Sequence, residues 1–297
     1  MAEKQHDHWI PDPAEHLIRS KFVDQTFRIR VFQPLMRKDA SERFPVLYAT
    51  DADKLFDALA ALSKEMQLFG EVQRFILVGI GYENRGAADA LRMRDLLTRD
   101  VQQRLAPITQ LLIDSPLVSG VEDIRTLTGS TDASAFLQFI RRELKPFIES
   151  RYPIGDQGAS FAGFSAGGSF GLYALFSEPD TFQRYILNSP GTSFNGHHFG
   201  IEMVAGLRNP SRPIQARLFM SVGELEEFYA QFNLTSGYYR MAKYLMDAKI
   251  PGLELICKML PEERHSSVWA ASFAHGLRVM FPIQEREGHQ IDFNVTT

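Results

Sequence analysis

Short apolar runs alternate with longer amphipathic stretches along most of the chain. Residues 26–32 alternate polar and apolar side chains and predict a strand with one face in water, whereas the continuous apolar run 74–80 predicts a strand covered on both faces. Further strands are predicted at residues 45–50, 159–164, 185–187, 216–222 and 253–260. Because helical patterns separate most of these strands, the chain is predicted to form an α/β fold with a mostly parallel central sheet and helices on both faces.

Helical periodicity marks the segments between the strands. It is found in residues 54–69, 134–150, 170–176 and 267–281. In the second of these helices, Pro146 is expected to bend the last turn. Residues 82–132 and 192–213 show no regular pattern, and we expect these long insertions to form irregular loops that build the walls of a pocket.

Composition is that of one globular domain. The chain has 297 residues, 44% of them hydrophobic, which is enough for a large core. No linker rich in glycine, serine or proline divides it, so we expect a single domain over residues 20–297 after an N-terminal extension of residues 1–19. A formal net charge of −4 without a basic stripe argues against nucleic acid as a partner. The sequence does not predict an oligomeric state.

The sequence gives no sign of membrane insertion or secretion. The first eight residues are polar and lack the apolar region of a signal peptide, and no apolar run approaches the roughly 20 residues of a membrane span. Cys257 is the single cysteine, which excludes an internal disulfide. We therefore expect a cytoplasmic protein.

The most specific motif is Gly-x-Ser-x-Gly at residues 163–167. An apolar strand-like run precedes it and an apolar helical pattern follows, the context in which this motif denotes a serine nucleophile. Side chains at Gly163 and Gly167 would be expected to collide across the sharp turn. Ser165 is the predicted nucleophile. The N–H of Ala166, at the positive end of the new helix, is predicted to face the substrate oxyanion.

A nucleophilic serine needs a base, and the base needs an orienting acid. In this strand–turn–helix architecture the chain order is serine, acid, histidine. His265 is the predicted base, because it follows the last predicted strand by a short loop and immediately precedes a helix. The other histidines suit the role less by position: His6, His8, His16, His197, His198, His275 and His289. His6-x-His8 is too weak a pattern to predict a metal site.

The acid is expected in the loop after residues 216–222. Gly223 ends that strand, and the Gly-x-x-acid spacing usual after this strand selects Glu226. Glu224 is the alternative. Glu227 is expected to be a solvated residue or to interact favourably with the dipole of the following helix.

These motifs together resemble the putative-esterase group of α/β-hydrolases, which includes esterase D, siderophore trilactone esterases, feruloyl esterases and mycolyltransferases. The resemblance is carried by residues 161–176, 179–182 and 188–190 around the serine, by the Pro-Val-Leu-Tyr-Ala-Thr-Asp run at 45–51, and by the acid and histidine loops at 222–226 and 260–268. It spans about residues 20–282. It implies the α/β-hydrolase fold and action on a small-molecule ester.

The resemblance also implies two further roles. The second oxyanion donor would be the backbone N–H of Asp53, two residues after Asp51, although Ala52 stands where the family has glycine. Arg94 lies in a segment that resembles a pocket motif of the family. It is a candidate for contact with an anionic substrate, the alternative being a structural pair with a carboxylate.

The sequence thus predicts a serine hydrolase that cleaves a carboxylic ester through an acyl-enzyme intermediate, without a metal or organic cofactor. Phe194 and Phe228 are candidate pocket residues, and they suit a hydrophobic or aromatic ester as well as a siderophore-type lactone. Two alternatives stay open: an acyltransferase with the same triad, and a non-catalytic binding protein that has kept the fold.

Overall fold

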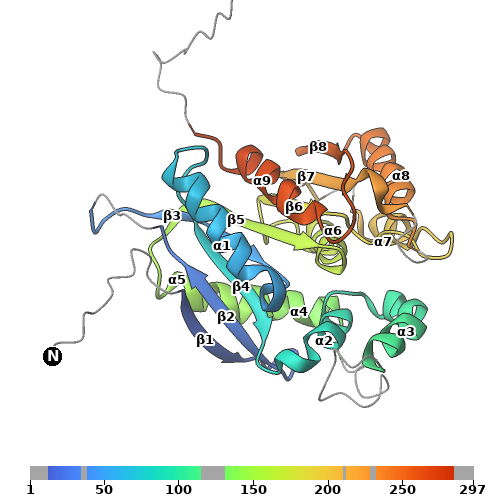
Figure 1. Cartoon of the computed structure of the whole chain (residues 1–297), viewed down its shortest axis with the longest axis horizontal. Helices are drawn as coiled ribbons and strands as arrows, with labels where there is room; N and C mark the ends of the chain where they lie inside the picture. The colour runs from blue at the N-terminus through green and yellow to red at the C-terminus, as the bar shows by residue number, and fades with distance from the viewer. Residues whose placement is uncertain (1–12, 35–38, 115–130, 210–211, 228–231, 284–297) are drawn as a thin grey trace, which may run out of the picture.

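The computed structural model describes residues 13–34, 39–114, 131–209, 212–227 and 232–283, which build an eight-stranded sheet flanked by helices (Figure 1). The strands are β1 (Ala14–Arg19), β2 (Thr26–Phe32), β3 (Phe44–Ala49), β4 (Ile76–Tyr82), β5 (Ile154–Phe164), β6 (Arg184–Asn188), β7 (Ala216–Gly223) and β8 (Leu253–Leu260). Their order in the sheet is β1-β2-β4-β3-β5-β6-β7-β8. Strand β2 runs antiparallel to both β1 and β4, and the remaining pairs are parallel, as predicted.

The first strand lies inside the segment that the sequence assigns to an N-terminal extension. β1 pairs along its whole length with β2, from Ala14 opposite Val31 to Arg19 opposite Thr26. Its residues alternate between partly buried and exposed positions, as on an edge strand. His16, which lies in that segment, hydrogen-bonds through Nε2 to the Tyr152 hydroxyl at 2.6 Å. The sheet therefore begins six residues before the predicted boundary.

Helices cover both faces of the sheet. They are α1 (Ala52–Leu68), α2 (Ala88–Asp95), α3 (Arg99–Ile113), α4 (Ala133–Phe139), α5 (Lys145–Glu149), α6 (Ala166–Ser177), α7 (Phe199–Leu207), α8 (Leu234–Ala248) and α9 (Val268–Met280). On one face, Phe56 of α1 and Phe273 of α9 belong to one apolar core; on the other, Phe136, Phe170 and Tyr238 of α4, α6 and α8 belong to a second. No helix in the described ranges is long and apolar enough to cross a membrane.

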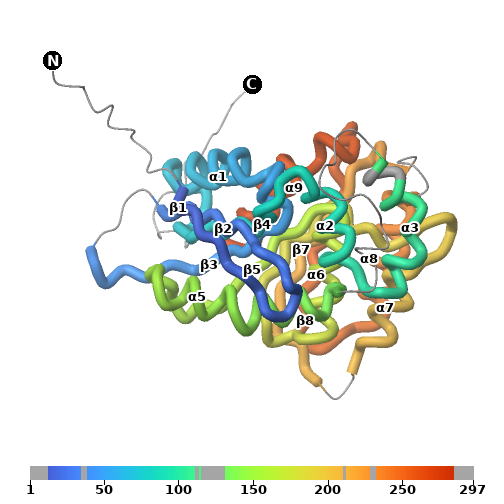
Figure 2. The backbone as a smooth tube through the Cα atoms, turned by 90° about the horizontal axis from the view of Figure 1, so that it is seen from below, coloured from blue at the N-terminus to red at the C-terminus, as the bar shows by residue number. Residues whose placement is uncertain are grey.

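The two long insertions contain helices, so the expectation of irregular loops was wrong. Residues 82–132 include α2 and α3, and residues 192–213 include α7. In α2 the charged Arg94 and Asp95 are buried as an ion pair, so the sequence of this helix lacks the continuous apolar face that predicts a helix. Figures 1 and 2 agree in placing α2, α3, α7 and α8 at the same end of the molecule.

The helix predicted over residues 134–150 is interrupted before its proline. A single wide π-helical turn, Ile140–Leu144, joins α4 to α5, and Pro146 lies in the first turn of α5. The missing N–H of proline costs little in a first turn, and the irregularity that the structure shows lies in the turn before Pro146. The helical periodicity predicted for this segment is confirmed by one buried apolar face: Phe136, Ile140, Leu144 and Ile148.

Candidate active site

Ser165 occupies the sharp turn between β5 and α6. Its backbone has φ 56° and ψ −114°, a conformation that non-glycine residues rarely adopt and that marks functional turns. The Ser165 N–H donates to the carbonyl of Asn188 at the end of β6 (2.9 Å), and the Ser165 carbonyl accepts from the N–H of Ser169 (3.0 Å). The neighbouring strand and the new helix thus both hold the turn in its strained shape.

The two glycines of the motif make room for different neighbours. A Cβ atom at Gly163 would lie 2.1 Å from the carbonyl oxygen of Gly167, so the first glycine prevents a collision across the turn, as predicted. A Cβ atom at Gly167 would instead lie 2.3 Å from Thr50 Oγ1 and 3.0 Å from Asp51 Oδ2. The second glycine therefore admits the loop after β3. The expected collision across the turn is not the reason for it.

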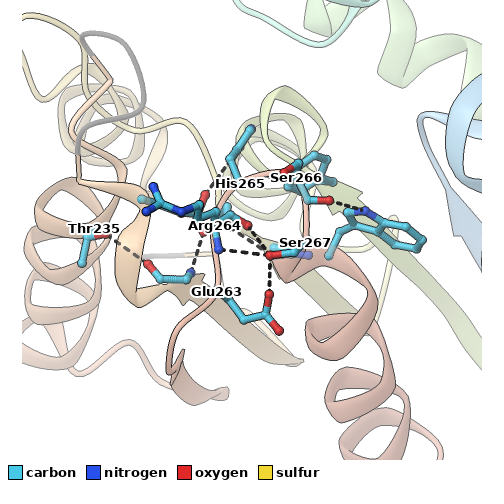
Figure 3. A network of polar contacts seen from close by, with 12 residues as sticks. Thr235, Glu263, Arg264, His265, Ser266 and Ser267 are labelled. Atoms are coloured by element: carbon cyan, nitrogen blue, oxygen red, sulfur yellow. Dashed lines mark hydrogen bonds and ion pairs between the residues drawn. The ribbon is translucent and has the colours of Figure 1, made fainter.

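His265 lies in the short loop between β8 and α9. Its Nδ1 is 2.5 Å from Glu226 Oε2, and its ring packs against that of Phe164 with centroids 4.6 Å apart. The loop itself is tied by hydrogen bonds around Ser267, whose hydroxyl accepts from the Arg264 N–H (3.1 Å) and donates to the Glu263 carboxylate (Figure 3). These contacts fix the imidazole, which is 11% exposed, at the carboxyl end of the sheet.

Glu226 is fully buried, and both of its carboxylate oxygens are bonded. Oε2 faces His265, while Oε1 accepts from the Ser189 hydroxyl (2.6 Å) and from the Gly223 N–H (2.5 Å). A buried carboxylate is tolerated only when its lone pairs find such partners. The acid is therefore held in one orientation toward the imidazole.

The other acidic residues of this loop are turned to different partners. Glu224 Oε2 accepts from the backbone N–H of Glu262 (2.9 Å), and Glu227 accepts from the N–H and hydroxyl of Ser236 (2.8 and 2.9 Å). Of the two acids that the sequence left open, Glu226 is the one that contacts His265.

Ser189 is a site residue that sequence reasoning missed. It is fully buried directly after β6 and has φ 43°, and its N–H donates to the Ser221 carbonyl (2.8 Å). This left-handed turn aims its hydroxyl at Glu226. The only signal in the sequence was the Asn188-Ser189-Pro190 triplet, which has no chemistry of its own until the acid is placed beside it.

Ser189→Ala is expected to lower kcat for the predicted ester hydrolysis about tenfold, because the lost hydrogen bond to a buried charged group leaves the carboxylate less well oriented. KM should stay within about threefold, since Ser189 does not line the cavity described below. The measurement is steady-state hydrolysis beside a thermal melt. Ser272→Ala, which removes another fully buried hydroxyl bonded to Ser221, is the matched control. An equal loss of kcat in both variants would contradict the role of Ser189.

A cavity of about 250 Å³ has Ser165, Ala166 and His265 in its wall. Much of its apolar lining comes from the two insertions: Met93, Leu105, Ile108 and Phe199 lie on their helices, and Leu97 lies in the bend between α2 and α3. The expectation that the insertions build the pocket walls is confirmed, although they do so with helices.

Two ion pairs form the polar side of the same cavity. Arg92 Nε lies 2.5 Å from Asp51 Oδ1, and the Lys54 ammonium pairs with Asp89. Burial alone would lower the pKa of Arg92, but the adjacent Asp51 carboxylate outweighs it and holds the pKa above its ordinary value. The four charges balance, so this wall offers no net charge to a ligand.

The remaining predicted site residues are placed as follows. The Asp53 carboxylate accepts hydrogen bonds from Arg28 (2.9 Å) and from the Tyr82 N–H (2.8 Å). Asp53 is not among the described residues that line the cavity, so the role of its backbone N–H as an oxyanion donor stays a prediction.

Arg94 forms a two-pronged pair with Asp95 (2.6 and 2.9 Å) and likewise lies outside that wall. Phe194 packs on Phe232, which does line the cavity. Phe228 lies outside the described residues.

The other histidines contribute nothing to this cavity where the structure describes them. His275 lies on α9 with its Nδ1 3.1 Å from Lys258 Nζ, and burial, with the charges of Lys258 and Arg278, lowers its pKa. His6, His8 and His289 fall outside the described ranges. Within those ranges no group of three or more His, Cys, Asp or Glu side chains is arranged to hold a metal ion.

Comparison with known proteins agrees with the motifs. Residues 123–252 match the family model described as putative esterase. The chain is 28% identical over 231 residues to the ferri-bacillibactin esterase BesA of Bacillus subtilis, covering 74% of this chain and 73% of the relative. It is 25% identical over 281 residues to the siderophore triacetylfusarinine C esterase of Aspergillus fumigatus, covering 86% and 89%.

A solved structure confirms the fold. The crystal structure of the BES protein from Bacillus cereus superposes with a TM-score of 0.72 at 23% identity, over 95% of this chain and 99% of that one. The eight-stranded sheet and its flanking helices therefore have the α/β-hydrolase fold. Fold, serine motif and relatives agree in the resemblance: the chain is similar to the putative-esterase group of α/β-hydrolases.

Proposed function

We propose that this protein is a serine hydrolase that cleaves an ester of siderophore type through an acyl-enzyme intermediate. The observation that carries the proposal is the buried Glu226 carboxylate on Nδ1 of His265, with that imidazole and the strained Ser165 in the wall of one cavity. A serine, a histidine and a buried acid in this arrangement have the parts needed to activate the hydroxyl.

The proposed reaction begins when Ser165 Oγ attacks the ester carbonyl and His265 takes its proton. Glu226 accepts from Nδ1–H, which leaves Nε2 free to act as the base and stabilises the imidazolium that forms. The N–H groups of Ala166 and Asp53 would hold the oxyanion. His265 then protonates the departing alcohol, and it later removes a proton from the water that attacks the acyl-enzyme, so that Ser165 is regenerated.

The substrate class is proposed from the relatives and fits the cavity. Both relatives are named as esterases of siderophores or their iron complexes. The cavity pairs an apolar wall from α2, α3 and α7 with a polar side whose charges already balance. This lining suits a neutral ester group flanked by a sizeable apolar or aromatic portion. A cytoplasmic location remains the expectation from the sequence.

The proposal is tested with a fluorophosphonate probe and a panel of substrates. We expect the probe to label the protein, and a siderophore trilactone to be opened faster than p-nitrophenyl esters of increasing chain length. Labelling without trilactone hydrolysis would overturn the substrate class alone. No labelling and no hydrolysis would favour a binding protein, and an acylated product formed when an alcohol acceptor is added would favour an acyltransferase.

A further inference from the structure

Arg92 on α2 contacts two chain segments that both line the cavity, one at Asp51 and one at Phe164. Its Nε donates to Asp51 Oδ1 in the loop between β3 and α1, at 2.5 Å, and its Nη2 donates to the carbonyl oxygen of Phe164, at 3.3 Å. Phe164 directly precedes Ser165, and Asp51 is two residues before Asp53. One guanidinium therefore joins the chain at the nucleophile to the chain at the predicted second oxyanion donor.

The two segments are in close contact at this point. Asp51 has φ 62°, a left-handed conformation unusual for a residue other than glycine. Its second oxygen, Oδ2, accepts from the Thr50 hydroxyl (3.2 Å) and lies 3.0 Å from where a Cβ atom of Gly167 would be. The Asp51 carboxylate is thus packed against the first turn of α6, the helix that starts at Ala166.

A carboxylate in this place creates an electrostatic problem for ester hydrolysis. Asp51 has a side chain only 5% exposed and lines the same cavity as Ser165 and Ala166. Negative charge develops on the substrate oxygen in the transition state, and a nearby unpaired carboxylate shielded from water would oppose it. The Arg92 guanidinium, 17% exposed, cancels that charge.

We propose that Arg92 is a positioning residue for the oxyanion site: it ties the loop after β3 to the elbow and neutralises Asp51. This inference rests on the proposed hydrolase function. The planar guanidinium of Arg92 has donors on Nε and Nη2 that match two acceptors on different segments. A lysine ammonium at the end of a flexible stem would not hold both acceptors in the same way. Arg92 therefore acts through the backbone, without touching the reacting atoms.

The test compares Arg92→Met with the double variant Asp51→Asn/Arg92→Met, using p-nitrophenyl butyrate. Losing Arg92 alone both frees the loop and leaves the Asp51 charge unpaired, so kcat is expected to fall about 100-fold, with KM within about threefold. The double variant removes the charge as well, and its kcat should recover to within about tenfold of wild type. Arg94→Met is the matched control, because Arg94 pairs with Asp95 on the same helix outside the cavity wall.

The outcomes separate a positioning role from a purely structural one. The Arg94→Met variant should lose thermal stability but keep wild-type kcat per folded molecule. An equal fall of kcat in Arg92→Met and Arg94→Met, or a double variant no faster than Arg92→Met, would overturn the proposal. If Arg92→Met does not fold, the double variant Asp51→Asn/Arg92→Met, which lacks both charges, decides. A wild-type kcat in the double variant overturns the proposal, and a severalfold lower kcat at unchanged KM supports it. Wild-type protein without turnover or probe labelling would instead overturn the proposed function itself.

Discussion

Ser165→Ala is expected to reduce ester hydrolysis to about one part in 10³ of wild type or less, and to abolish labelling by a fluorophosphonate. The reason is chemical: Ser165 stands at the strained strand-to-helix turn and shares a cavity wall with His265, whose imidazole contacts the buried Glu226. Turnover and labelling are measured on the purified variant. Its melting temperature should stay close to wild type, because alanine meets the same backbone strain at φ 56° as serine does.

Two variants serve as controls for the serine. His265→Ala should match the loss, because the nucleophile then has no base. Ser177→Ala, at the far end of α6, removes a hydroxyl from the same helix outside the cavity and should keep its turnover. Near wild-type turnover in the Ser165 variant would reject the proposed nucleophile.

Glu226→Gln is expected to lower kcat by up to about 10⁴-fold with little change in KM. The Ser189 hydroxyl and the Gly223 N–H both need an oxygen at the Oε1 position, so the amide group of glutamine must face His265. The amide would then donate to Nδ1, and the imidazole proton would move to Nε2. A histidine in that tautomer cannot accept the proton of Ser165.

The neighbouring Glu224→Gln variant is the control for the acid. Its carboxylate bonds to the backbone of Glu262 at the surface, and its loss should cost less than about tenfold in kcat. Both variants are compared by steady-state kinetics on the same ester. A large defect in Glu224→Gln together with a mild one in Glu226→Gln would transfer the acid's role to Glu224.

Features set by local spacing were predictable from the sequence. The serine turn depends on two glycines and the residues between them, and the position of Glu226 depends on three residues after a strand end. Strands β2 and β7 and helix α9 were placed to within one or two residues, because each has a clear hydrophobic period.

What the sequence did not reveal depends on contacts between distant segments. Arg92 and Arg94 lie two residues apart on one helix, yet the structure turns Arg92 toward the cavity and Arg94 toward Asp95. The resemblance singled out Arg94, with a structural carboxylate pair as its alternative, and gave no reason to consider Arg92. Side-chain direction on α2 is set by packing, which spacing in the sequence does not reveal. Ser189 was missed for a similar reason: its partner Glu226 is 37 residues further along the chain.

The three hydrogen bonds of Glu226 come from the ends of three neighbouring parallel strands: Ser189 follows β6, Gly223 ends β7, and His265 follows β8. One carboxylate thus ties together the rim of the sheet at the place where the chemistry is proposed. Loosening of any of these strand ends on warming would release the imidazole before the apolar cores open. On heating, such an enzyme would accordingly lose activity at a lower temperature than the one at which it unfolds.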